Sequence, residues 1–149
     1  MGSPQGEKNR AAQMPFPSRL SAAMEDYLEA VAALMHPSKG VRVKELAAYL
    51  QVTMPTVSQA LKLLQRAGLI THERYGAVHL TTGGAKVAQD VQRRHQILYD
   101  FLSQVLKLDS DVADADACKM EHVVSRTTLN RLVEFVTQCS PRQEGDTCV

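Results

Sequence analysis

Residues 43–68 read VKELAAYLQVTMPTVSQALKLLQRAG, and this segment carries the strongest indication of the fold. Apolar residues recur at helical spacing over 43–50 and again over 56–67, which predicts two short helices joined by a tight polar connection. Pro55 stands at the start of the second helix, where its missing N–H costs nothing, and Gly68 is expected to end that helix. Two short helices that cross a shared core through so short a turn are typical of the helix-turn-helix.

The segments on either side predict a winged form of this motif. An amphipathic helix is expected over residues 20–35, with Ser18 and Ser21 as candidate N-caps. Weak alternation of apolar and polar residues over 69–81, around a Tyr-Gly turn, predicts a β-hairpin. The order helix, helix, turn, helix, hairpin is that of the winged helix-turn-helix.

The rest of the chain is predicted to be helical. Thr82-Gly83-Gly84 is expected to mark a break before a long helix over 85–106. Two further helices are predicted over 110–124 and 127–138, the last one capped by Ser125. The predicted fold class is therefore mainly α, an N-terminal winged helix-turn-helix followed by a second, α-helical domain.

Domain organisation follows from these patterns and from the polar ends of the chain. We expect a disordered arm at 1–19, a winged helix-turn-helix at 20–84, a helical domain at 85–139 and a flexible tail at 140–149.

Composition excludes several classes of protein. No run approaches the ~20 apolar residues that span a bilayer, and the N-terminus lacks a secretory signal, so we expect a cytoplasmic protein without membrane contact. The odd count of three cysteines argues against a disulfide framework. Of these, Cys139 is interpreted as a small apolar filler, and Cys148 is given no role.

Charge is distributed unevenly along the 149 residues. Residues 38–94 hold nine Lys/Arg against three Asp/Glu, whereas residues 95–149 hold five against nine. A basic middle and an acidic C-terminal third indicate a module that binds a polyanion, joined to a second module.

The polyanion suggested by the fold is double-stranded DNA. In a helix-turn-helix the second helix enters the major groove, and its N-terminal polar residues face the base edges, while the hairpin tip meets phosphate or the minor groove. The alternative is a domain for protein contacts with a merely solvated polar face. The candidate DNA-binding residues are Thr53, Pro55, Thr56, Ser58, Gln59, Lys62 and Arg74.

A second group of residues has the chemistry of metal ligands. Cys118, Glu121 and His122 stand at i, i+3 and i+4, so a helix over 110–124 would carry a thiolate, a carboxylate and an imidazole on one face. Asp26 and Glu29 form another i, i+3 pair on the first helix. His95 stands on the long helix; each of these pieces alone is also typical of a solvated surface.

Four short motifs resemble the diphtheria toxin repressor family, which includes iron-dependent repressors and manganese transport regulators. They are MEDYLE at 24–29, PTVSQ at 55–59, Arg94-His95, and EHVVS at 121–125, and the resemblance covers about residues 20–138. It implies that the second domain binds metal and forms a homodimer, and that metal-loaded dimers bind palindromic operators and repress metal-uptake genes. Some members carry an SH3-like C-terminal domain, and we expect the short form without it.

The resemblance also implies a ligand set. By position the ligands would be Asp26, Glu29, His95, Cys118, Glu121 and His122. Manganese regulators have an acidic residue at Cys118, whereas iron-type members have Cys there but Met at Asp26 and a non-ligating residue at Glu29. A second, ancillary site of the iron type would need Glu at Tyr99 and His at Asp114.

The mixed donor set leaves Fe²⁺ and Mn²⁺ both open as the co-repressor. Hard oxygen ligands suit Mn²⁺, and a thiolate favours softer ions, so Cys118 inclines the prediction towards Fe²⁺, with Co²⁺, Ni²⁺ or Zn²⁺ binding in vitro.

Two other functions use the same residues. A winged-helix regulator could respond to oxidation of Cys118 rather than to metal. A metal-dependent enzyme would need a substrate pocket with acid and base partners, and the sequence supplies no nucleophile or phosphate cradle. We therefore expect a protein that is not an enzyme and has no small organic substrate.

Overall fold

A computed structural model describes residues 20–74 and 76–139, and of Cys139 it describes the backbone alone. The predicted N-terminal arm, the C-terminal tail and Cys148 lie outside the described residues. The elements, in chain order, are α1 (Ala22–Leu34), α2 (Val43–Leu50), α3 (Met54–Arg66), β1 (Ile70–His72), β2 (Val78–Leu80), α4 (Thr82–Asp100), the π-helix η1 (Phe101–Val105), α5 (Ser110–Met120) and α6 (Arg126–Cys139).

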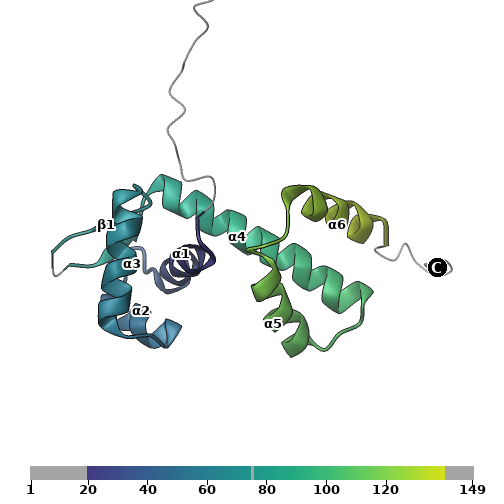
Figure 1. Ribbon diagram of the computed structural model, residues 1–149, viewed down its shortest axis with the longest axis horizontal. Coiled ribbons are helices and arrows are strands. Elements are labelled where there is room, and N and C mark those ends of the chain that lie inside the picture. Colours follow the sequence, from purple (N-terminus) through teal and green to yellow (C-terminus); the bar gives the residue numbers. More distant parts are fainter. Residues whose placement is uncertain (1–19, 75, 140–149) are drawn as a thin grey trace, which may run out of the picture.

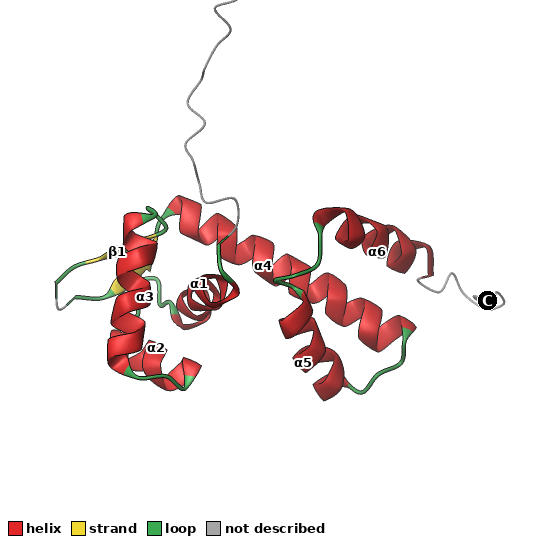
Figure 2. Ribbon diagram, in the orientation of Figure 1, coloured by secondary structure: helices red, strands yellow, loops and turns green. Residues whose placement is uncertain are grey.

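The mainly α fold with an N-terminal winged helix-turn-helix is confirmed (Figures 1 and 2). Helices α1 to α3 and the hairpin form an N-terminal lobe, while α5 and α6 pack at the other end of α4. Of the two predicted N-caps of α1, Ser21 caps the helix, since its Oγ accepts from Met24 N, and Ser18 lies outside the described residues. Thr53 caps α3, and its Oγ1 accepts from Thr56 N. Gly68, at φ 73°, ends the turn after α3.

The core of the N-terminal lobe joins all its elements. Leu28 and Val31 of α1, Leu46 of α2 and Leu61 of α3 are fully buried in one cluster. Strands β1 and β2 pair antiparallel with Ile70 opposite Leu80, and Val41 forms an isolated β-bridge to Val78. The helix α1 is therefore an integral part of the DNA-binding lobe.

Helix α4 begins earlier than predicted. Thr82-Gly83-Gly84 is not a break but the first turn of α4, capped by Thr81, whose Oγ1 accepts from Gly84 N at 3.1 Å and donates to Gly68 O at 2.7 Å. A Cβ at Gly84 would lie 1.8 Å from the carbonyl oxygen of Leu69. The glycine is thus required because the start of α4 packs directly on the backbone that enters β1.

The C-terminal lobe has its own small core, which includes Leu98, Leu102, Ala117 and Leu129. The predicted helix over 85–106 is α4 continued by the π-helix η1. Helix α5 ends at Met120, four residues before the predicted end, and Ser125 caps α6 by accepting from Thr128 N at 3.2 Å. Among the described residues, no helix is long and apolar enough to cross a membrane.

Candidate functional site

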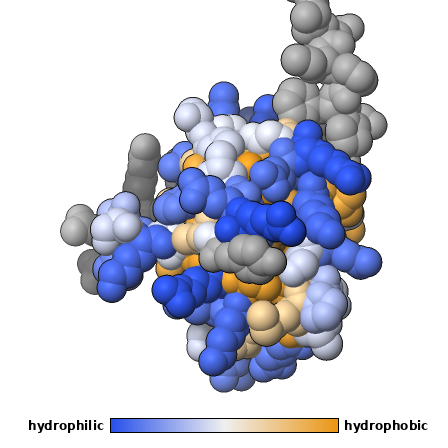
Figure 3. Space-filling view, turned by 90° about the vertical axis from the view of Figure 1, so that its left-hand side faces the viewer, coloured by the Kyte–Doolittle hydropathy of each residue, from blue (hydrophilic) through white to orange (hydrophobic). Residues whose placement is uncertain are grey.

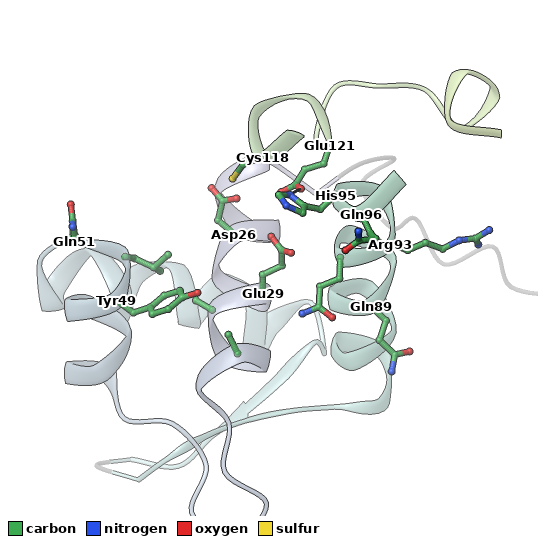
Figure 4. Close-up of a pocket in the computed structure, with 14 residues that line it drawn as sticks. Asp26, Glu29, Tyr49, Gln51, Gln89, Arg93, His95, Gln96, Cys118 and Glu121 are labelled. Atoms are coloured by element: carbon green, nitrogen blue, oxygen red, sulfur yellow. Dashed lines mark hydrogen bonds and ion pairs between the residues drawn. The ribbon is translucent and has the colours of Figure 1, made fainter. Parts of the chain in front are cut away.

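Three helices bring the predicted metal ligands together between the two lobes (Figure 4). Asp26 and Glu29 project from α1, His95 projects from α4, and Cys118 lies on α5 with Glu121 directly after its end. The i, i+3 spacing on α1 places both carboxylates on the side that faces α4 and α5.

The tightest part of the cluster consists of Asp26, Glu121 and His122. One ligand atom from each lies within 4.8 Å of the others. His122 Nε2 is 2.9 Å from Asp26 Oδ1 and 3.2 Å from Glu121 Oε1. Because metal–ligand distances for nitrogen and carboxylate oxygen are about 2.0–2.2 Å, a single cation placed between these atoms could contact all three after small adjustments.

His95 joins this trio through Glu121. Its Nδ1 lies 2.8 Å from Glu121 Oε2, and its Nε2 lies 3.0 Å from Asp114 Oδ1. Asp114 occupies the position where a histidine is expected in iron-type members of the diphtheria toxin repressor family, which this sequence resembles. Here its carboxylate orients the ring of His95, since a carboxylate that accepts one ring N–H leaves the other nitrogen as an acceptor.

Glu29 and Cys118 face the same space. Together with Asp26, His95 and Glu121 they line a cavity of about 880 Å³ that opens between α1, α4 and the end of α5. Cys118 is exposed to solvent. All six predicted ligands therefore lie at one place: five line the cavity, and His122 reaches it through its ion pairs with Asp26 and Glu121.

The electrostatics of the cluster favour a cation. Burial, followed by the charge of Glu121, raises the pKa of Glu29 from 4.5 to about 7. Burial also raises the pKa of Glu121. The thiol of Cys118 is only partly shielded from solvent, but this partial burial, followed by the charge of Glu121, raises its pKa as well. For His122, burial lowers the pKa, but the hydrogen bond with Glu25 and the charges of Asp26 and Glu121 outweigh it and raise the pKa overall.

The residues present fit a divalent first-row metal. Glu121 is 1% exposed, and its Oε1 is one of the buried side-chain atoms without a hydrogen-bond partner in the described part of the chain. A buried carboxylate oxygen without such a partner is costly unless a cation or water meets it. The carboxylate, imidazole and thiol groups around Glu121 are of the types that bind divalent first-row metals.

One geometric expectation needs correction. Cys118, Glu121 and His122 do not all stand on one helix, because α5 ends at Met120 and residues 121–123 form a turn. Glu121 keeps helical backbone angles, and its N–H still donates to Ala117 O at 3.0 Å. His122 reaches Asp26 from the turn, which lets its ring point at α1.

Two residues that hold this arrangement were missed at the sequence level. Glu25 is 7% exposed, and it accepts hydrogen bonds from Arg94 of α4 and from the ring of His122. Its position three residues before Leu28 puts a carboxylate on the buried face of α1, and that is the signal that could have revealed it. Arg94 belongs to the Arg94-His95 motif, which by itself assigns no role to the arginine.

The predicted DNA-binding residues lie at the N-cap of α3, on its first three turns and on the hairpin. Thr53, Pro55, Thr56, Gln59, Lys62 and Arg74 are exposed, and Ser58 is half-buried. The hydroxyls of Thr53 and Thr56 are 2.8 Å apart, so both are partly engaged in capping α3. Figure 3 views the molecule from the side where α3 and the hairpin lie in Figure 1, and hydrophilic residues cover most of this face.

A winged helix-turn-helix linked to a cluster of metal ligands defines a metal-dependent transcriptional regulator. Known proteins agree with this class. Residues 19–78 match the sequence profile described as "Iron dependent repressor, N-terminal DNA binding domain", and residues 81–147 match "Iron dependent repressor, metal binding and dimerisation domain". The chain belongs to the iron dependent repressor family.

Individual relatives support the same assignment. The transcriptional regulator MntR of Salmonella typhimurium is 38% identical over 115 residues, which are 77% of this chain and 73% of the relative. Among solved structures, a manganese-dependent transcriptional repressor in complex with manganese is 31% identical with a TM-score of 0.69, covering 76% of this chain and 52% of that one. ScaR with bound Zn²⁺ is 28% identical with a TM-score of 0.67, and the coverage is 76% and 53%.

The chain spans about half the length of these two solved structures. Its relatives are transcriptional regulators and not enzymes, which confirms the expectation of a non-enzymatic protein. The chain is thus a DNA-binding regulator with a metal-binding and dimerisation domain, and its class of cofactor is a divalent metal ion.

Proposed function

We propose that the chain acts in the cytoplasm as a homodimeric repressor that binds palindromic operators when Fe²⁺ or Mn²⁺ occupies the cluster between its lobes. The genes it controls would serve metal uptake or metal homeostasis. The proposal keeps the domain boundaries at 20–84 and 85–139, with metal bound where the two domains meet.

The ligands proposed are Asp26, Glu29, His95, Cys118, Glu121 and His122. The observation that carries the proposal is the position of the buried Glu121 carboxylate. One of its oxygens lies 2.8 Å from His95 Nδ1, and the other lies 3.2 Å from His122 Nε2 without a hydrogen bond. A bound divalent cation would supply positive charge beside Glu29 and Glu121, whose pKa values are raised by burial and also by the neighbouring charge of Asp26.

The same cluster offers a route from metal to DNA. Asp26 and Glu29 belong to α1, and α1 is packed in the core of the DNA-binding lobe through Leu28 and Val31. Holding Asp26 beside His122 therefore fixes the DNA-binding lobe relative to α5. In a dimer this would set the separation of two α3 helices at about 34 Å, one turn of DNA, or a multiple of it.

On DNA, we propose that α3 enters the major groove. Gln59 can pair with adenine, Thr56 and Ser58 can reach bases or phosphates, and Lys62 stands behind them to meet phosphate. Thr53 and Pro55 would shape the start of α3 as it enters the groove. Arg74, in the turn between β1 and β2, would contact phosphate or the minor groove.

The redox alternative is less well supported. A reactive cysteine needs a lowered pKa, and burial together with nearby carboxylates raises the pKa of Cys118 instead. Cys118→Ser separates the two functions: a redox sensor would lose its response to peroxide, whereas a metal sensor would still answer to metal.

Selection of DNA from a random-sequence library tests the proposal. We expect the full-length protein with Mn²⁺, or with Fe²⁺ under anaerobic conditions, to enrich a palindromic sequence, and the protein with EDTA to enrich none. Enrichment of the same sequence with EDTA, or of an asymmetric one with metal, would contradict it.

A further inference from the structure

Glu25 is a buried carboxylate that lies next to the metal ligands without being one of the six. It directly precedes Asp26 on α1 and is 7% exposed. Its Oε2 lies 2.7 Å from His122 Nδ1, and its Oε1 accepts from Arg94 Nη2 at 3.0 Å. Both oxygens are therefore used within the protein, and Glu25 is not among the residues that line the cavity shared by the other acids.

Arg94 connects Glu25 to the backbone of a ligand. Its Nη1 donates to the carbonyl oxygen of Glu121 at 2.7 Å, while its Nη2 bonds Glu25. The guanidinium is 12% exposed, and Asp90 lies 3.5 Å from its Nε. One arginine from α4 thus holds a carboxylate on α1 and the turn after α5 in a fixed relation.

This arrangement determines which nitrogen of His122 is available. A carboxylate beside Nδ1 stabilises the proton on that nitrogen, and this leaves the lone pair on Nε2. His122 Nε2 is the atom that faces Asp26 at 2.9 Å and Glu121 at 3.2 Å. When the ring gives up one proton to bind a cation, the Glu25 carboxylate therefore keeps the proton on Nδ1, and Nε2 becomes the ligand atom.

We propose that Glu25 is a positioning residue of the metal centre: it fixes the orientation and tautomer of His122, and Arg94 holds it in place. The inference rests on the proposed metal-dependent function. Because Glu25 belongs to α1 and His122 follows α5, the same hydrogen bond ties the DNA-binding lobe to the metal-binding lobe. Loss of such an outer partner of a ligating histidine typically weakens metal binding about 10–100-fold.

The test compares wild type with Glu25→Gln, which keeps the size of the side chain and removes its charge. We expect the affinity for Mn²⁺, measured by calorimetry, to fall about 10–100-fold. In the Zn²⁺-loaded protein, the Nδ1 proton of His122 should give a protected downfield NMR signal that moves upfield or is lost in the variant. A residue with a merely structural role would not change that signal.

Two further variants make the test decisive. Glu134→Gln is the matched control, the same substitution at an exposed carboxylate of α6 that pairs with Arg131, and it should bind Mn²⁺ like wild type. If Glu25→Gln does not fold, the pair Glu25→Leu with Arg94→Met removes both buried charges together, which avoids a stranded charge. This pair should show the same loss of affinity and of the NMR signal.

The outcomes are distinct. Wild-type Mn²⁺ affinity in Glu25→Gln or in the double variant would overturn the role of Glu25, as would an unchanged Nδ1 proton signal despite weakened binding. Failure of the wild-type protein to bind Mn²⁺ or Zn²⁺ would instead overturn the proposed function on which this inference rests.

Discussion

The imidazole of His122 lies between two consecutive residues of α1: its Nδ1 is 2.7 Å from Glu25 Oε2, and its Nε2 is 2.9 Å from Asp26 Oδ1. Glu25 and His122 are 97 residues apart in the chain. One side chain from the metal-binding lobe therefore contacts the DNA-binding lobe with both of its nitrogens. A change in the charge or position of this ring therefore alters its contacts with α1.

The contact between Gly84, at the start of α4, and the backbone of Leu69, just before β1, predicts an effect on stability. Gly84→Ala would place a Cβ against the Leu69 carbonyl, at 1.8 Å without rearrangement, so we expect it to destabilise the protein by about 1–3 kcal/mol or more. Gly83→Ala is the matched control, since its Cβ would meet its nearest atoms at 3.7 Å, and alanine favours a helix. Urea unfolding measures the free energy of unfolding of each variant. Equal values for Gly84→Ala and Gly83→Ala would contradict a tight contact between Gly84 and Leu69.

The raised pKa of Glu29 predicts a pH dependence of metal binding. Below its pKa of about 7 the carboxyl group is protonated, and it must lose that proton to bind a cation. Apparent Mn²⁺ affinity should therefore rise between pH 6 and 8, by up to about tenfold per pH unit for each proton released.

Calorimetry in buffers of different ionisation enthalpy counts these protons. Glu29→Gln should bind Mn²⁺ more weakly and release fewer protons, while Glu134→Gln should match wild type. An Mn²⁺ affinity that is the same at pH 6 and pH 8 would show that Glu29 is not a ligand or is already ionised.

Substitution of the thiol tests the contribution of Cys118 to metal preference. Because sulfur favours softer ions, Cys118→Ser should weaken Zn²⁺ and Co²⁺ binding by roughly tenfold more than Mn²⁺ binding. Competition titrations under reducing, anaerobic conditions give these ratios, and Cys148→Ser serves as the control. Equal losses for all three ions would mean that the thiol is not bound to the metal.

The DNA-binding surface gives two separable effects. Gln59→Ala should make the free energy of binding to the preferred sequence less favourable by about 1–3 kcal/mol and relax the preference at one base pair. Lys62→Ala should weaken binding to all sequences and lower the salt slope, which is the slope of log affinity against log salt concentration, by about 1. Arg131→Ala removes a positive charge from α6 and should leave both quantities unchanged. Binding isotherms over a range of salt concentrations distinguish these cases, and an unaltered salt slope in Lys62→Ala would exclude a phosphate contact.

The fold of the N-terminal lobe could be predicted because its signals are local. The N-cap of α1 at Ser21, the proline in the first turn of α3 and the glycine that follows α3 all act within a few residues. The start of α4 was predicted wrongly for the opposite reason. Two glycines were interpreted as a break, but the constraint on Gly84 comes from the Leu69 carbonyl in another segment.

The metal-binding site likewise combines features with local signals in the sequence and features that depend on long-range contacts. Residue types and spacing singled out Asp26, Glu29, Cys118, Glu121 and His122 as metal-competent, and the family resemblance added His95 of α4 to the predicted ligand set. Glu25 could not be assigned a role, because its partners Arg94 and His122 lie 69 and 97 residues away. The end of α5 at Met120, which frees His122 to turn towards α1, also depends on packing between the lobes rather than on a local signal.

Operator affinity with and without metal tests whether the bound metal controls DNA binding. The probe is a fluorescent duplex carrying the sequence selected by the metal-loaded protein, and anisotropy is measured with Mn²⁺, with anaerobic Fe²⁺ and with EDTA. A coupling of about 1–3 kcal/mol predicts roughly 5–150-fold tighter binding with metal, and Asp26→Asn should lose most of this difference. Equal affinity for the duplex in Mn²⁺, Fe²⁺ and EDTA would contradict the account.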